Sequence, residues 1–216
     1  MGDIAGIPSP GVPLTFGVPG EPAAILVPDG YGRLPWLEPY ATALADRARL
    51  RVLVPDLYQG VATDDAEEAE RLLAEFSLES ALGEVHSAVA DARAEGSARI
   101  GVVGFGTGGR IALLAAQAGA ADAVVAYDAT LDAEEHAILP APVLLQLADV
   151  ATWRDGAEPE AFLDRLRDHG TPVARHDYAG ARPGFANATA GDAFDARIAA
   201  LAFARTAVFL EERLHD

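Results

Sequence analysis

Residues 102–116 read VVGFGTGGRIALLAA, and they are the most informative segment of the chain for its fold. It begins with a continuous apolar run, which predicts a buried strand, and it ends in an apolar segment with helical spacing. Four glycines lie between the two, at positions 104, 106, 108 and 109. Glycine is required where a strand and the following helix fold back too closely to leave room for a Cβ atom. The stretch therefore predicts a strand, a tight turn and a helix that packs on the strand.

The same alternation of short apolar runs and amphipathic segments extends over the whole chain. The predicted strands cover residues 14–18, 23–27, 51–54, 100–103, 123–127, 143–147 and 173–178. The predicted helices cover residues 34–48, 66–76, 79–94, 108–119, 159–169 and 193–213. This alternation indicates an α/β fold with a mostly parallel central sheet flanked by helices on both faces. A length of 216 residues suits one such domain over residues 1–216.

The composition excludes several classes of function. A net charge of −17 argues against a nucleic-acid surface, because binding to phosphates needs clustered cations. The chain has no cysteine, which removes disulfides, thiolate nucleophiles and Cys-ligated metals. All 16 basic residues are arginine, so Schiff-base chemistry on lysine is excluded as well. We expect no cofactor and no metal site.

The chain also carries no pattern typical of a membrane or secreted protein. The longest apolar runs, such as residues 111–116, are too short to span a bilayer. No basic segment precedes an apolar stretch at the N-terminus, so we expect no signal peptide. We therefore expect a soluble, cytoplasmic protein whose partner is a small molecule. The sequence does not determine its oligomeric state.

In a parallel sheet, ligands bind beyond the carboxyl ends of the strands. Those ends fall at residues 28–31, 55–58, 104–109, 127–128 and 148–149. Three of them carry an aspartate that can face a common space: Asp29, Asp128 and Asp149. Carboxylates that converge in a partly buried pocket raise one another's pKa, so one could act as an acid and another as a base. We also expect five larger side chains at the mouth of this space: Tyr31, Tyr58, Tyr127, Trp153 and Arg182.

Four segments make the chain resemble the dienelactone hydrolases, a family with the α/β-hydrolase fold. They are PDLY at residues 55–58, VVGFGTGGRIALLAA at 102–116, residues 142–153, and YAGARPGFAN at 178–187. They occur in the order of the family, and the resemblance spans roughly residues 20 to 212. In that family the turn between residues 104 and 108 has the pattern G-x-nucleophile-x-G, which lifts the nucleophile above the sheet.

The resemblance implies that all three positions of the catalytic triad are substituted. Gly106 stands at the position of the nucleophile, Pro183 at that of the histidine, and Ala151 at that of the acid. If the loop is two residues shorter, Asp149 takes the place of the acid. Asp29 stands where the family has a glutamate that interacts with the nucleophile. No serine falls on a strand-to-helix turn, so we expect no ordinary esterase activity.

The resemblance further implies that backbone donors of an oxyanion hole remain, at the N–H groups of Gly30 and Thr107. With a glycine at position 106, ligand has room where the nucleophile stood. The prediction is a non-hydrolytic enzyme, such as an isomerase, cyclase or lyase, that uses the aspartates on a small carbonyl compound. The alternative is a pseudoenzyme that binds a small molecule or a protein.

A second alternative rests on three glycines. Gly104, Gly106 and Gly109 satisfy the G-x-G-x-x-G pattern between a strand and a helix, and Asp128 follows about 20 residues later. Taken alone, this pattern is typical of a dinucleotide-binding site. The motif lies in mid-chain, however, and a hydrolase-type turn explains the same glycines.

Overall fold

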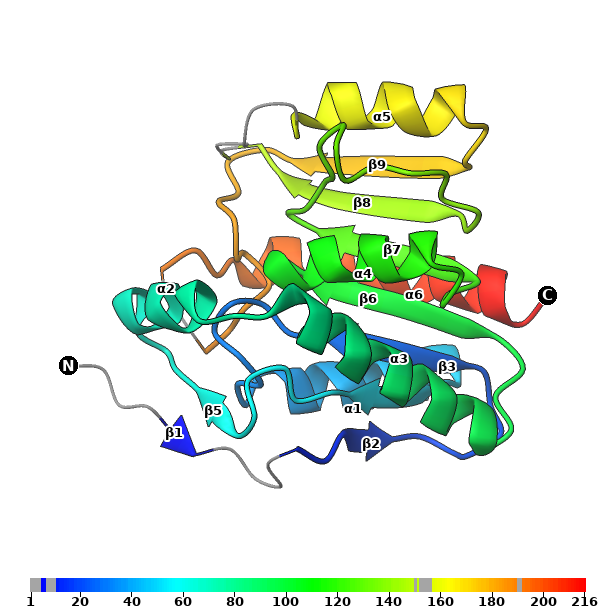
Figure 1. Ribbon diagram of the computed structural model, residues 1–216, viewed down its shortest axis with the longest axis horizontal. Coiled ribbons are helices and arrows are strands. Elements are labelled where there is room, and N and C mark those ends of the chain that lie inside the picture. Colours follow the sequence, from blue (N-terminus) through cyan, green and yellow to red (C-terminus); the bar gives the residue numbers. More distant parts are fainter. Residues whose placement is uncertain (1–4, 7–10, 150, 152–156, 190–191) are drawn as a thin grey trace.

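The fold is organised around one seven-stranded sheet (Figure 1). The computed structural model describes residues 5–6, 11–149, 151, 157–189 and 192–216. In spatial order the sheet contains β2 (Leu14–Phe16), β4 (Arg51–Val54), β3 (Ala23–Val27), β6 (Ile100–Phe105), β7 (Ala123–Tyr127), β8 (Val143–Ala148) and β9 (Val173–Tyr178). β2 pairs antiparallel with β4, and every other pair is parallel. The predicted mostly parallel sheet is confirmed.

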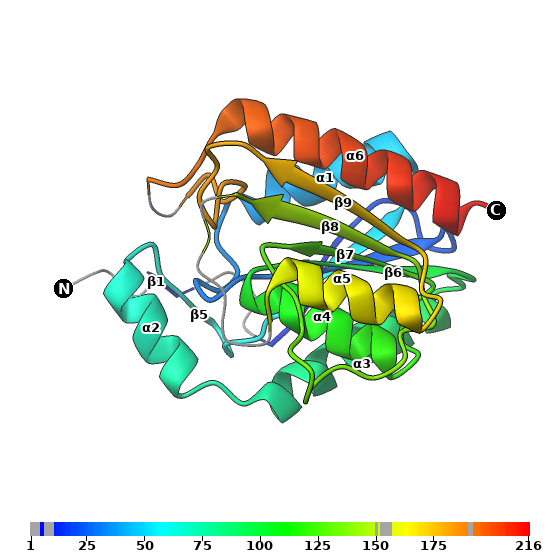
Figure 2. The same cartoon turned by 90° about the horizontal axis from the view of Figure 1, so that it is seen from above.

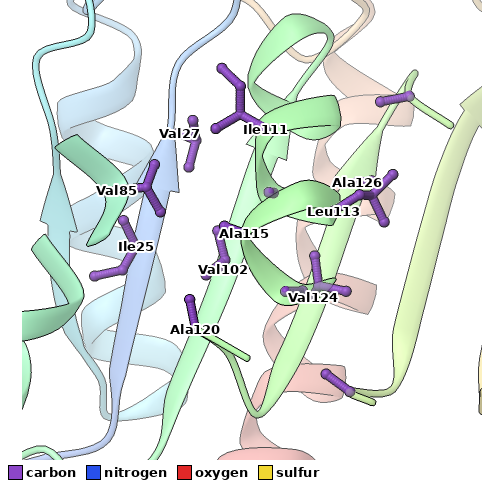
Figure 3. Packing of buried hydrophobic residues seen from close by; sticks show 14 of the residues in the cluster. Ile25, Val27, Val85, Val102, Ile111, Leu113, Ala115, Ala120, Val124 and Ala126 are labelled. Carbon is purple, nitrogen blue, oxygen red and sulfur yellow. The ribbon is translucent and has the colours of Figure 1, made fainter. Parts of the chain in front are cut away.

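Helices cover both faces of the sheet (Figure 2). One face carries α1 (Leu37–Ala48) and α6 (Ala196–Leu214), and the other carries α3 (Leu78–Ala94), α4 (Thr107–Gln117) and α5 (Pro159–Asp168). Each layer has its own apolar core, because all side chains of the central strands β3, β6 and β7 are buried. Figure 3 shows the second core, in which Ile25, Val102 and Val124 from three neighbouring strands belong to one buried cluster with Ile111 and Leu113 of α4.

The structure contains elements that the sequence pattern does not predict. β1 (Ala5–Gly6) and β5 (Val61–Ala62) form a separate two-stranded sheet. Next to it, α2 (Ala66–Ala74), which the sequence predicts as a helix over residues 66–76, lies beyond the carboxyl ends of the main strands (Figure 1). Two predicted helices also begin later than expected, at Leu37 and Ala196. A hydrogen-bonded turn precedes α1, and the Asp195 carboxylate caps the first turn of α6. Within the described residues, no helix is long and apolar enough to cross a membrane.

The turn between β6 and α4 is held by close approach of backbone to backbone. A Cβ on Gly104 would overlap the carbonyl of Gly108, and a Cβ on Gly108 would overlap the carbonyl oxygens of Val27 and Pro28. At the apex, Gly106 has φ 50° and ψ −115°, a backbone conformation that residues with a Cβ rarely adopt. The two flanking glycines therefore let α4 fold back tightly against β6 and the end of β3.

Gly104→Ala should destabilise the protein, because its methyl group meets backbone atoms that cannot move aside. We expect a loss of about 3 kcal/mol or more in the free energy of unfolding, measured by urea denaturation. Gly83→Ala is the matched control. Gly83 lies inside α3, and a Cβ there meets nothing within 4 Å. The control should stabilise the chain by about 0.5–1 kcal/mol, since alanine favours a helix over glycine. Equal effects of the two changes would contradict the packing of the turn.

Candidate functional site

A cavity of about 340 Å³ lies at the carboxyl ends of β3, β6 and β7. The ends of these strands and the residues after them form its floor, α2 covers one side, and the loop after β9 closes another. The lining residues are Asp29, Gly30, Tyr31, Trp36, Ala66, Ala69, Glu70, Leu73, Phe105, Gly106, Thr107, Tyr127, Asp128, Pro183, Gly184, Ala186 and Asn187. The volume is sufficient for a small organic molecule.

Asp29 is the carboxylate that faces the apex of the turn. A Cβ built on Gly106 would lie 3.9 Å from the Cβ of Asp29, with no nearer atom outside the turn. The Asn187 side-chain amide donates to Oδ2 of Asp29 at 2.8 Å, and the Tyr31 N–H donates to Oδ1 at 3.1 Å. The side chain is only 9% exposed, and this burial raises the pKa of the Asp29 carboxyl to about 6. Asp29 therefore changes protonation state close to neutral pH.

Two backbone donors border the same space. Thr107 is the first residue of α4, so its N–H has no acceptor within the helix. Neither this N–H nor that of Gly30 donates to any described residue. The positive end of α4 adds to the local potential. The Leu73 side chain of α2 lies against Gly30. A Cβ on Gly30 would come within 2.8 Å of Cδ1 of Leu73. These donors can bind a carbonyl or enolate oxygen.

Asp128 lines the cavity but is engaged by the backbone on both oxygens. The Ala148 N–H donates to Oδ1 at 2.8 Å, and the Gly184 N–H donates to Oδ2 at 3.0 Å. Asp128 also has a positive φ of 48°. It thus fastens the end of β7 to β8 and to the loop after β9. Burial raises its pKa to about 6, and the two backbone donors lower it in part.

The predicted convergence of three aspartates is corrected by the structure. Asp149 is exposed, lies outside the lining of the cavity, and accepts a hydrogen bond from the Gly180 N–H at 2.7 Å. It lies directly after β8, and its carboxylate contacts the turn after β9. Asp29 and Asp128 do share the cavity, but burial is the main cause of both raised pKa values, and neither carboxylate shifts the other.

Of the five side chains expected at the mouth of the cavity, two line it and two lie outside it. Tyr31 and Tyr127 line the cavity. The Tyr127 hydroxyl is bound to Thr206 at 2.7 Å, so only its ring is available. Tyr58 lies outside the cavity, and Arg182 is exposed and donates to the Asp192 carbonyl. Trp153 lies outside the described residues.

Two of the three positions that correspond to the family's catalytic triad lie at the cavity. Gly106 and Pro183 line the cavity, and Ala151 is half-buried outside it. All five histidines of the chain are described, and none lines the cavity. The described serines lie outside it as well. The groups required for acyl transfer by a serine and a histidine are therefore not brought together in the described site.

The lining residues that sequence reasoning missed include Trp36, Glu70, Phe105 and Asn187. Asn187 is within the segment that resembles a family loop, but nothing in its spacing indicates a contact with Asp29. Trp36 and Phe105 read as core residues, and their rings do pack edge-to-face at 4.8 Å. Glu70 lies in an acidic stretch that predicts a solvated helix start. Only the position of α2 over the cavity assigns it to the site.

The dinucleotide pattern has a purely structural explanation. Gly104 is required by the carbonyl of Gly108, and a Cβ on Gly109 would come within 2.7 Å of the Ala129 Cβ. The start of α4 is also packed against the loop after β3, through Gly108. Packing of the turn thus accounts for Gly104 and Gly109, and the backbone conformation at the apex accounts for Gly106.

Comparison with known proteins places the chain among hydrolase folds. The profile of the dienelactone hydrolase family matches residues 19–214. The structure of m3DLH has a TM-score of 0.71 and 20% identity, over 92% of this chain and 88% of the other. The dienelactone hydrolase-like promiscuous phosphotriesterase P91 from metagenomic libraries has a TM-score of 0.70 and 17% identity, over 89% and 86%. The hyperthermophilic esterase from the archaeon Pyrobaculum calidifontis has a TM-score of 0.66 and 17% identity, over 91% of this chain and 78% of the other.

At these identities, the similarity to solved structures shows the α/β-hydrolase fold and not the activity. No curated protein matches the chain.

The raised pKa of Asp29 predicts a pH-dependent cost in stability. Because the folded-state pKa of about 6 lies above the unfolded value of 3.8, protonated Asp29 favours folding. This contribution is complete below pH 3.8 and is lost as the pH rises through 6. Above pH 7 the ionised form costs about 3 kcal/mol. Asp29→Asn removes this cost. The free energy of unfolding of the variant minus that of the wild type should therefore increase by up to about 3 kcal/mol as the pH rises from 4 to 8.

The measurement is urea unfolding of both proteins across this range. Asp128 and every other titrating group are common to the two chains, so the difference isolates Asp29. A difference that stays constant from pH 4 to 8 would contradict the raised pKa.

Proposed function

We propose that this chain, which belongs to the dienelactone hydrolase family of the α/β-hydrolase superfamily, is an acid–base enzyme that acts on a small carbonyl compound without hydrolysing it. One observation carries the proposal. A buried carboxyl group, Asp29, faces the empty apex of the turn at Gly106, beside two backbone N–H groups that have no described acceptor. A base next to donors for an oxyanion is the arrangement that proton abstraction beside a carbonyl group requires.

In this proposal the protein lacks the nucleophile that hydrolysis through a covalent intermediate requires. The family places its nucleophile at the apex of this turn, and here the apex is Gly106. Pro183 and Ala151 stand at the positions of the histidine and the acid, and neither side chain can transfer a proton. In the proposed enzyme, the missing side chain at position 106 gives the substrate direct access to Asp29.

The reaction would begin with the carbonyl oxygen of the substrate accepting hydrogen bonds from the Gly30 and Thr107 N–H groups. Ionised Asp29 then removes a proton from the adjacent carbon. The electrons of that C–H bond form a C=C bond, and the π electrons of the carbonyl move to its oxygen, which gives an enolate. If the substrate has a further C=C bond conjugated with the enolate, protonated Asp29 returns the proton to the far carbon of the resulting dienolate, the C=O bond is restored, and the product is an isomer with a shifted C=C bond. With a leaving group on the next carbon, the enolate expels it instead, which is lyase chemistry.

The pKa of Asp29 suits this role. A base with a pKa of about 6 is mostly ionised at neutral pH, and its conjugate acid still gives up the proton readily. Asn187 would be a positioning residue in this reaction. Its amide donates to Oδ2 of Asp29, and its own Oδ1 is fixed by the Thr189 N–H at 3.0 Å. The carboxylate is therefore held in one orientation towards the cavity.

Asp29→Asn should abolish proton abstraction while the fold persists. The assay is exchange of the protons beside the carbonyl group of small ketones in D₂O, followed by ¹H NMR. The wild type should accelerate exchange over buffer, and Asp29→Asn should lower the rate by about 10²-fold or more. Asp149→Asn is the matched control, because Asp149 lies outside the cavity. It should exchange at the wild-type rate.

The outcomes separate the two functional classes. Full exchange activity in the Asp29→Asn variant would contradict the acid–base proposal. Ligand binding by the wild type without any exchange would instead support a pseudoenzyme.

We also expect no turnover of simple esters or of dienelactone above the uncatalysed rate, because Gly106 offers no nucleophile. The measurement is release of 4-nitrophenol from its acetate and of product from dienelactone. Esterase activity that a single substitution in the cavity abolishes would overturn the proposed loss of the triad.

A further inference from the structure

The charged side chains around the cavity are all of one sign. Asp29 and Asp128 lie on its floor and Glu70 lies on α2, and none of its described lining residues is an arginine or a histidine. The described arginines of neighbouring segments have other partners. Arg33 donates to the Val12 carbonyl at 2.6 Å, and Arg110 donates to the Glu135 carboxylate. An anionic ligand would meet only carboxylates among these charges, which is unfavourable in a partly enclosed space.

Aromatic rings form much of the remaining lining. They belong to Tyr31, Trp36, Phe105 and Tyr127. The Phe105 ring packs on Tyr127 with centroids 4.6 Å apart and on Trp36 at 4.8 Å, so the three form one continuous cluster. Aromatic rings combined with carboxylates favour an organic cation, because ring faces attract positive charge.

Glu70 completes this environment from the side of α2. It lines the cavity yet forms no hydrogen bond or ion pair with any described residue. Its neighbour on the same helix, Glu68, is paired with Arg71. The charge of Glu70 is therefore available to a ligand, and it contributes to the raised pKa of Tyr31, after burial and the charges of Asp29 and Asp65.

We propose that the carbonyl compound bound in this cavity carries a protonated amine or a quaternary ammonium group. The proposal rests on the proposed function and adds the class of substrate to it. The carbonyl oxygen binds at the Gly30 and Thr107 N–H groups. The ammonium group lies against the aromatic rings and within the field of Glu70. Ketones that bear a carboxylate or phosphate are rejected.

The test compares binding of three methyl ketones that share one propyl chain. The far end of the chain carries a trimethylammonium group, a tert-butyl group of the same shape, or a carboxylate. Titration calorimetry measures binding directly, whether or not any of them is turned over. We expect the cationic ketone to bind at least about fivefold more tightly than the neutral one. The carboxylate should bind most weakly.

Two variants locate the preference on α2. Glu70→Gln should reduce the preference for the cationic over the neutral ketone by about two- to fivefold. Glu67→Gln is the matched control, since it removes the same charge from the same helix at an exposed position outside the cavity lining. It should leave the preference nearly unchanged. Equal loss in both variants would assign the effect to the net charge of the protein.

Three results would overturn the inference: no binding of the cationic ketone, binding of the carboxylate as tight as that of the cation, or equal effects of the two variants. None of them decides the proposed function. If neutral ketones undergo exchange that depends on Asp29 while the cation gains no affinity, the acid–base function stands and the cationic substrate is wrong. If the cation binds selectively without exchange, the binding inference stands and the acid–base function is wrong.

Discussion

The close approach of α4 to the end of β3 is the constraint on which the site depends. Gly108 leaves no room for a Cβ against the carbonyl oxygens of Val27 and Pro28, and these residues lead directly into Asp29. The same contact therefore fixes the distance between Asp29 and the apex of the turn at Gly106. It also places Thr107, at the start of α4, in the lining of the same cavity as Gly30. The base and the oxyanion donors of the proposed reaction are consequences of a single backbone packing.

Burial of carboxylates in this cavity opposes stability. Asp29 and Asp128 both sit where burial raises their pKa, so each is costly to keep ionised at neutral pH. The chain offsets the cost differently at the two positions. Asp128 receives two backbone N–H groups and connects β7 to β8 and the following loop. Asp29 receives one N–H and one side-chain amide, and it faces the emptied apex. Both carboxylates line the cavity with both oxygens hydrogen-bonded, and what distinguishes Asp29 is its place next to Gly106 at the apex of the turn.

The family fold does not determine the chemistry of this member. Structural neighbours with 17–20% identity include proteins described as an esterase and as a phosphotriesterase. The scaffold supplies strand ends, a turn and backbone donors, and the side chains at those places define the reaction. Here the aromatic cluster and the three acidic side chains that line the cavity favour the cationic ligand that we propose.

The alternation of strands and helices could be predicted from the sequence, because apolar periodicity and glycine spacing are local properties of the chain. The sequence also placed Asp29, Gly30, Gly106 and Asp128 at strand ends. Only the tertiary structure decided that Asp149 lies outside the cavity, that Asn187 holds Asp29 across 158 positions of sequence, and that α2 brings Glu70 over the site. These contacts join segments that are distant in sequence. They depend on how loops pack over the edge of the sheet, and no residue pattern within one segment encodes that geometry.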